Sequence, residues 1–237
     1  HEDAILQDKK TYIAALKKDI AMESHRFSGA ILKTIFIGGG TPNLFIPEEI
    51  NELINEIKFY FKFTKNIEIT MEVNPGSLEK KKLSDYKLAG VNRLSIGAQS
   101  FNPQLLKFLG RTHNVEDIFS TIEDARLADF KNINLDLMFG LPSQTMKLAQ
   151  KDLREAINLN PEHISYYQMT IEPNTIFYKK RPKNLPSSDR LYNMHESGLE
   201  ILEAANYSRY EISAFAKPQE ECQHNLNYWI FGDYIAV

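Results

Sequence analysis

Three consecutive glycines, Gly38–Gly40, follow an apolar run and precede Thr41 and Pro42. A phosphate-binding loop of the G-x-x-x-x-G-K-[ST] type needs a lysine that this stretch lacks. A dinucleotide fingerprint would need a third glycine where Asn43 stands, and Pro42 disfavours helical backbone at Thr41. The bare backbone can instead approach a ligand closely, and with the Thr41 hydroxyl it can hold a small zwitterion such as an amino-acid moiety. A tight turn without a ligand is the alternative.

Polar side chains also follow later apolar runs. Glu72 can accept two hydrogen bonds from a ribose diol, and Gln99 offers both a donor and an acceptor. Arg111 suits a carboxylate held by two hydrogen bonds, and Asp136 stands among apolar neighbours, where an acid needs a partner. Each residue alone also fits a structural role, as an ion pair or a hydrogen-bonded rim group. Together, four polar groups at one edge favour a ligand site.

Strands alternate with helices along the chain, which predicts parallel pairing with right-handed crossovers. The polar residues stand toward the carboxyl ends of short buried strands. This pattern predicts the α/β class and a complete or partial (β/α) barrel with its site at the C-terminal rim. A doubly wound open sheet is the alternative. The expected strands are Thr34–Ile37, Ile67–Val73, Arg93–Ile96, Ile133–Met138 and His163–Met169, and the expected helices run from Pro47, from Ser77 to near Gly90, from Asn114 to Ala128 and over Thr145–Leu159.

Both ends of the chain predict that the sequence is a piece of a larger fold. Asp3–Met22 reads as an amphipathic helix, and a barrel helix in this place normally follows a strand. The last residues, "GDYIAV", stop inside an apolar run. We therefore expect a missing N-terminal strand and loop, a partial barrel over residues 1–205, and the truncated start of a C-terminal region over residues 206–237.

Eight segments spread over nearly the whole chain carry a resemblance to a known family: "IFIGGGTP", "EVNPG", "GVNRLSIGAQSF", "LGRTH", "NLDLMFGLP", "IEPNT", "YEISAFAKP" and "HNLNYW". With these segments the chain resembles the radical S-adenosylmethionine (SAM) enzymes, in the branch of oxygen-independent coproporphyrinogen III oxidase and the heme chaperone HemW. The resemblance implies that Gly38–Gly40 and Thr41 meet the methionine end of SAM and that Glu72 holds its ribose. Gln99, Arg111 and Asp136 match positions that hold SAM, or a second SAM molecule, in the oxidase.

The resemblance also implies a [4Fe–4S] cluster. In the family a CxxxCxxC motif holds three irons and leaves the fourth open to SAM. Cys222 is the only cysteine of this sequence, so the chain has no cluster ligands and no catalytic residue is assigned. Either the cluster loop lies upstream of His1, which the absent first strand favours, or the cluster has been lost. As it stands, the chain cannot perform radical chemistry.

The segment from His224 to Trp229 looks like the HNxxYW motif of the chaperone branch, and Thr170–Thr175 also fits that branch. His224 is therefore the candidate heme ligand, because neutral imidazole is an axial ligand of heme iron. Packing at the junction with the C-terminal region is its alternative role. The function implied is a heme chaperone that binds SAM, a cluster and heme. Oxidative decarboxylation of coproporphyrinogen III is the alternative, and a barrel enzyme of unrelated chemistry is the third.

Composition limits the partners and the cellular compartment that we expect. The 237 residues carry a net charge of −3, and no basic stripe argues for nucleic acid. No run of about 18 apolar residues could span a membrane, and a single cysteine favours a reducing, cytoplasmic compartment. The partners expected are heme and heme-accepting proteins, membrane-associated acceptors included, and a homodimer is allowed.

Overall fold

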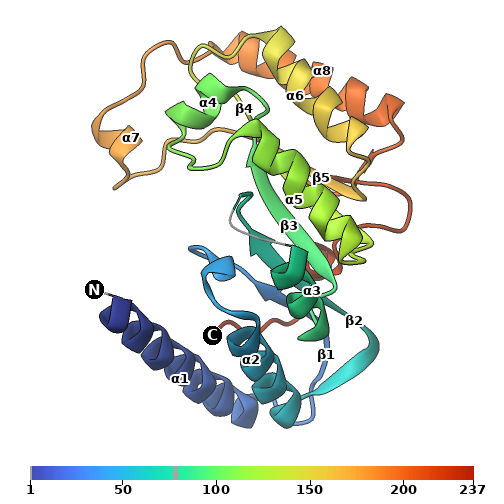
Figure 1. The fold of residues 1–237 in the computed structure, drawn as a ribbon. Coiled ribbons are helices and arrows are strands. Elements are labelled where there is room, and N and C mark those ends of the chain that lie inside the picture. The colour runs from blue at the N-terminus through green and yellow to red at the C-terminus, as the bar shows by residue number, and fades with distance from the viewer. Residues whose placement is uncertain (1, 77–79) are drawn as a thin grey trace.

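A computed structural model describes residues 2–76 and 80–237 of the chain. Its centre is a sheet in the order β1-β2-β3-β4-β5-β7-β6 (Figure 1). The first five strands are parallel and stand side by side in chain order. A doubly wound sheet would reverse its order at a switch point, so the sheet is a curled half-barrel and the predicted α/β barrel class is confirmed. These strands are β1 (Ile31–Ile37), β2 (Lys62–Val73), β3 (Arg93–Gln99), β4 (Asn132–Phe139) and β5 (His163–Gln168).

The long helices follow one another along the outside of the sheet (Figure 1). Contacts join α1 to α2, α2 to α3, α3 to α5, and α6 to α8. The long helices are α1 (Glu2–Arg26), α2 (Pro47–Tyr60), α3 (Lys80–Leu88), α5 (Val115–Leu127), α6 (Met146–Asn158) and α8 (Ser188–Ala204). Four short ones are η1 (Pro42–Leu44), α4 (Pro103–Phe108), α7 (Ile176–Lys179) and α9 (Gln223–Trp229).

The strands have two different faces. On β3, Leu94 and Ile96 belong to the main apolar core that the helices cover, whereas Arg93 and Ser95 alternate with them. On β4, Ile133, Leu135 and Leu137 point into that core, and Asn132, Asn134 and Asp136 stand between them. Because successive side chains point to opposite faces of a strand, the inner face of the half-barrel is lined by polar groups.

Two helices begin at the capping residues that the sequence predicts. The Asn114 side chain accepts a hydrogen bond from the Asp117 N–H and caps α5. Thr145 accepts from the Leu148 N–H at the start of α6. Both caps satisfy an N–H group that the first turn of a helix leaves without a partner. The predicted cap at Ser77 lies outside the described residues.

The last strands depart from the predicted parallel pattern. β7 (Ala214–Ala216) pairs antiparallel with β5, and β6 (Ser208–Arg209) pairs antiparallel with β7. Strands of two and three residues are too short to show a hydrophobic period. Helix α8 was also absent from the prediction. The domain boundary expected after residue 205 stays a prediction.

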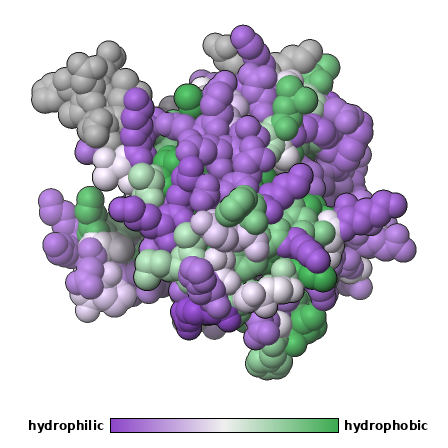
Figure 2. Space-filling model, turned by 90° about the horizontal axis from the view of Figure 1, so that it is seen from below, coloured by the Kyte–Doolittle hydropathy of each residue, from purple (hydrophilic) through white to green (hydrophobic). Residues whose placement is uncertain are grey.

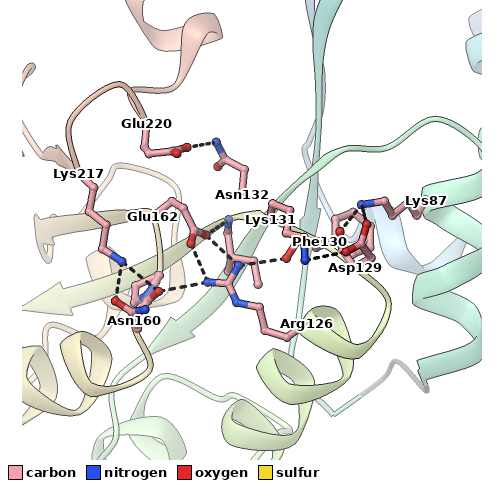
Figure 3. Close-up of polar contacts among 12 residues, drawn as sticks. Lys87, Arg126, Asp129, Phe130, Lys131, Asn132, Asn160, Glu162, Lys217 and Glu220 are labelled. Carbon is pink, nitrogen blue, oxygen red and sulfur yellow. Dashed lines mark hydrogen bonds and ion pairs between the residues drawn. The ribbon is translucent and has the colours of Figure 1, made fainter.

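A cluster of polar contacts connects the segments at the edge of the sheet where β4 and β5 begin (Figure 3). Arg126 pairs with Glu162 at 3.0 Å and donates to the carbonyls of Phe130 and Asn160. The Asn160 side chain accepts from Lys217 at 2.6 Å. The cluster therefore joins α5, the starts of two strands and the segment after β7.

The face seen in Figure 2 is mainly hydrophilic, with apolar residues in small groups between polar ones. This fits a chain with a mean hydropathy of −0.37. Within residues 2–76 and 80–237, no helix is long and apolar enough to cross a membrane.

Candidate functional site

The carboxyl ends of the strands surround a pocket of about 210 Å³. This is several times the ~30 Å³ that a water molecule occupies in the liquid, so a small-molecule group fits. Five predicted site residues line it: Gly40, Glu72, Gln99, Arg111 and Asp136. The other lining residues are Pro42, Asn43, Val73, Asn74, Ser95, Gly97 and Tyr167. The structure thus brings the predicted polar groups of β2, β3 and β4, and Arg111, to one rim.

The glycine triplet has a structural reason on this rim. Gly39 and Gly40 have φ values of +81° and +56°, which favour glycine. A Cβ on Gly38 would lie 3.0 Å from both Glu72 Cδ and Phe36 Cε1. The Gly39 N–H donates to Glu72 Oε2 at 3.2 Å. The triplet therefore lets the loop close over β2 and hold the Glu72 carboxylate.

The environment of Glu72 changes its acidity. Burial raises the pKa of Glu72, the Gly39 N–H opposes that rise, and the charge of Asp136 adds to it. A half-buried carboxylate with one backbone donor keeps further acceptor positions for a ligand. Such a group can accept hydrogen bonds from a diol.

Asn74 connects two predicted residues, and the sequence reasoning missed it. Its Nδ2 lies 3.4 Å from the Thr41 hydroxyl oxygen, and its Oδ1 accepts from Arg111 Nη1 at 3.3 Å. Thr41 itself is not among the pocket-lining residues. The signal for Asn74 was its place two residues beyond Glu72, on the same face of the chain as it leaves β2.

Gln99 reaches the pocket through an irregular backbone. The pairing of β3 with β4 shifts between Ile96 and Gln99, and Gln99 has φ +66°. Its Oε1 accepts from the Tyr167 hydroxyl at 2.6 Å. Burial raises the pKa of Tyr167 to about 12, so this phenol stays protonated and donates. The sequence reasoning also missed Tyr167. Because side chains along the strand "ISYYQ" point alternately to its two faces, Tyr167 faces away from the buried Tyr166.

Asp136 is held by hydrogen bonds from its own strand, β4, and from the neighbouring strand β3. Ser95 Oγ donates to its Oδ2 at 3.1 Å, and Asn134 Nδ2 donates to its Oδ1 at 2.8 Å. Burial raises the pKa of Asp136, and the donors Asn134, Ser165 and Ser95 oppose that rise. Asp136 therefore has the hydrogen-bonded partners that an acid in this position requires, and it also faces the pocket.

His224 lies apart from the pocket-lining residues. It is on α9, its Nδ1 is 2.9 Å from the Thr34 hydroxyl, and its ring lies 5.1 Å from that of Phe36. The backbone N–H of His224 donates to Glu68 Oε1 at 3.1 Å, so Glu68 caps the first turn of α9. Burial lowers the pKa of His224.

Cys222 is buried, and its Sγ lies 3.4 Å from Glu68 Oε1. Burial raises its pKa to about 11, so it is a thiol rather than the thiolate that a cluster binds. In the described part of the chain, no group of three His, Cys, Asp or Glu side chains could hold a metal ion. The residues present thus do not fit a [4Fe–4S] cluster, whereas the rim pocket offers carboxylate, amide and guanidinium groups to a small molecule.

A second, larger cavity of about 690 Å³ lies between the loops that precede α6 and α8. Met146, Met194 and Leu185 are among its lining residues, with Arg190. None of the predicted site residues lines it.

Residues 8–156 match the model of the radical SAM superfamily, and the chain belongs to that superfamily. Membership implies SAM and a [4Fe–4S] cluster, and it confirms the resemblance drawn from the motifs. Within the superfamily, the chain is 48% identical to the heme chaperone HemW of Haemophilus influenzae over 97% of its length and 61% of that protein. It is 41% identical to HemW of Bacillus subtilis over 95% of its length and 60% of that protein.

Among solved structures, the chain is similar to the coproporphyrinogen III oxidase HemN of Escherichia coli, which is described as a radical SAM enzyme. The TM-score is 0.81 at 29% identity, covering 90% of this chain and 49% of that one. The chain therefore spans about 60% of the length of the HemW relatives and about half of the oxidase.

Proposed function

We propose that this chain is the SAM-binding barrel of a heme chaperone of the HemW type. The observation that carries the proposal is the rim pocket, which Glu72, held by the glycine loop, lines together with Asp136, in a chain 48% identical to a HemW protein. Gly38–Gly40 and Thr41 would meet the methionine end of SAM. Glu72 would accept from the ribose hydroxyls, and Gln99, Arg111 and Asp136 would complete the site.

The cluster that accompanies SAM in this superfamily would supply an electron, and the three cysteines that would hold it are not among the residues of this chain. The residues present bind and orient: Arg111 offers a cation for a carboxylate, and the Glu72 and Asp136 carboxylates offer acceptors.

Heme is the proposed cargo, and His224 is its proposed axial ligand. Because burial lowers its pKa, the imidazole is neutral at pH 7, which is the form that binds iron. Thr34 holds Nδ1, so Nε2 is the nitrogen that would face the iron. The partners would be heme-accepting proteins in the cytoplasm, some of them membrane-associated, with a homodimer as a further proposal.

Coproporphyrinogen III oxidation is the second candidate, and the TM-score of 0.81 to the oxidase favours it. The identity of 29% to that enzyme is lower than the 41–48% to the two HemW relatives, which supports the chaperone.

Titration of the protein with hemin, followed in the Soret region, separates the two functions. We expect saturable binding of one heme per chain, weakened in His224→Ala, because a neutral imidazole would be lost. His25→Ala, on the exposed end of α1, is the control and should bind as the unchanged protein does. Release of carbon dioxide from coproporphyrinogen III by anaerobically reconstituted protein that includes the cluster-binding loop would contradict the chaperone proposal.

A further inference from the structure

Side chains on the inner face of the sheet connect the rim pocket with helix α9. Asp136 Oδ1 accepts from Asn134 Nδ2 at 2.8 Å, and Asn134 Oδ1 lies 2.6 Å from His163 Nδ1. His163 Nε2 lies 2.7 Å from the Tyr210 hydroxyl. The Tyr210 oxygen accepts from Asn225 Nδ2 of α9 at 3.2 Å. The pocket and the helix of the HNLNYW segment are thus joined without a gap.

Chemistry fixes the orientation of the Asn134 amide. Its nitrogen donates to Ser95 Oγ at 2.8 Å as well as to Asp136, and its oxygen lies 3.1 Å from Ser165 Oγ. Ser95 gives its single hydroxyl proton to Asp136 Oδ2, so its oxygen can only accept from the Asn134 amide nitrogen. The amide nitrogen therefore faces Ser95 and Asp136, and the amide oxygen faces His163. The proton of His163 is therefore on Nδ1.

The same reasoning extends to α9. His163 is 1% exposed, and its burial, with the charge of Arg93, lowers its pKa well below its usual value. The ring is neutral, so Nε2 carries no proton and accepts from the Tyr210 hydroxyl. The Tyr210 oxygen in turn accepts from Asn225. Each hydrogen-bond donor of this network points from α9 toward Asp136, and hydrogen bonds linked in this way polarise one another.

We infer that Asn134, His163, Tyr210 and Asn225 position the Asp136 carboxylate, so that the ligand affinity of the pocket depends on the docking of α9. His163 and Tyr210 are positioning residues, since they act on the pocket through Asn134. The inference rests on the proposed function in taking SAM as the ligand. Coupling between two sites is reciprocal, so ligand binding at the pocket should also stabilise α9.

Hydrogen exchange of the α9 amides, residues 223–229, tests the inference with and without SAM. We expect SAM to slow this exchange in the unchanged protein but not in Tyr210→Phe, which removes the hydroxyl that links His163 to Asn225. We also expect Tyr210→Phe to weaken SAM binding about fivefold, the typical effect of one hydrogen bond. Tyr207→Phe is the matched control, because the buried hydroxyl of Tyr207 donates to the Pro161 carbonyl at 2.6 Å and takes no part in this hydrogen-bond network. It should keep both the SAM effect and the affinity.

Two results would overturn the inference. One is that SAM still slows α9 exchange in Tyr210→Phe. The other is that SAM binds the original protein without slowing α9 exchange. If Tyr210→Phe does not fold, Asn225→Ala removes the last donor at a half-buried position instead. Absence of SAM binding by the unchanged protein would count against the proposed function. A ligand-free double-mutant cycle of Asp136→Asn and Tyr210→Phe on α9 exchange then decides the inference: non-additive effects support it, and additive effects refute it.

Discussion

At the residue scale, the site shows why polar types at strand ends could be predicted while their contacts could not. Glu72, Gln99 and Asp136 follow apolar runs, and the geometry of parallel strands brings such positions to one rim. Asn74 and Tyr167 were missed because their roles depend on neighbours from other strands. Pairings such as Tyr167 with Gln99 exist only in the folded sheet.

Gly38→Ala tests the close approach of the loop to Glu72. The new Cβ would lie 3.0 Å from Glu72 Cδ, so the carboxylate must move. We expect SAM affinity to fall and the free energy of unfolding to decrease by about 1–3 kcal/mol, measured by calorimetric titration and urea denaturation. Gly29→Ala is the control. Gly29 lies before β1 with φ +84°, where alanine is strained, so the variant should lose stability; its Cβ would meet nothing within 4 Å, so SAM affinity should not change. Equal SAM affinity in both variants would contradict the role of Gly38.

At the element scale, alternation along β3 and β4 builds two environments from the same strands. Their apolar side chains pack under the helices, and their polar ones line the inner face. The five parallel strands were predictable because their apolar runs are bounded by turn residues, and α5 and α6 because their caps are visible in the sequence. β6 and β7 were not, since their pairing with β5 is set by the tertiary fold.

Arg126→Ala tests how the start of the strands is fastened. The change leaves Glu162 and the carbonyls of Phe130 and Asn160 without their guanidinium donor. We expect a loss of about 1–3 kcal/mol in the free energy of unfolding, measured by urea denaturation. Lys131→Ala is the control, because its pair with Asp129 is largely exposed and should contribute at most about 1 kcal/mol. Similar losses in the two variants would refute this role of Arg126.

At the scale of the whole molecule, the order of the strands and the TM-score of 0.81 to the radical SAM enzyme HemN agree with membership in the radical SAM superfamily. The sheet is a half-barrel whose inner face carries the polar chain from α9 to the rim. The predicted heme ligand lies on that helix, and the predicted SAM residues lie at the rim. The two ligands proposed for this protein, SAM and heme, would therefore act on connected parts of one structure.

SAM binding to the rim pocket is the most direct test of this account, measured by calorimetric titration of the protein and of Glu72→Ala. Because a hydrogen bond to a charged group is typically worth about 1.5–3 kcal/mol, we expect affinity to fall tenfold or more in Glu72→Ala. Glu48→Ala, on the exposed first turn of α2, should bind as the unchanged protein does. An unchanged affinity in Glu72→Ala would contradict the assignment of this pocket to SAM.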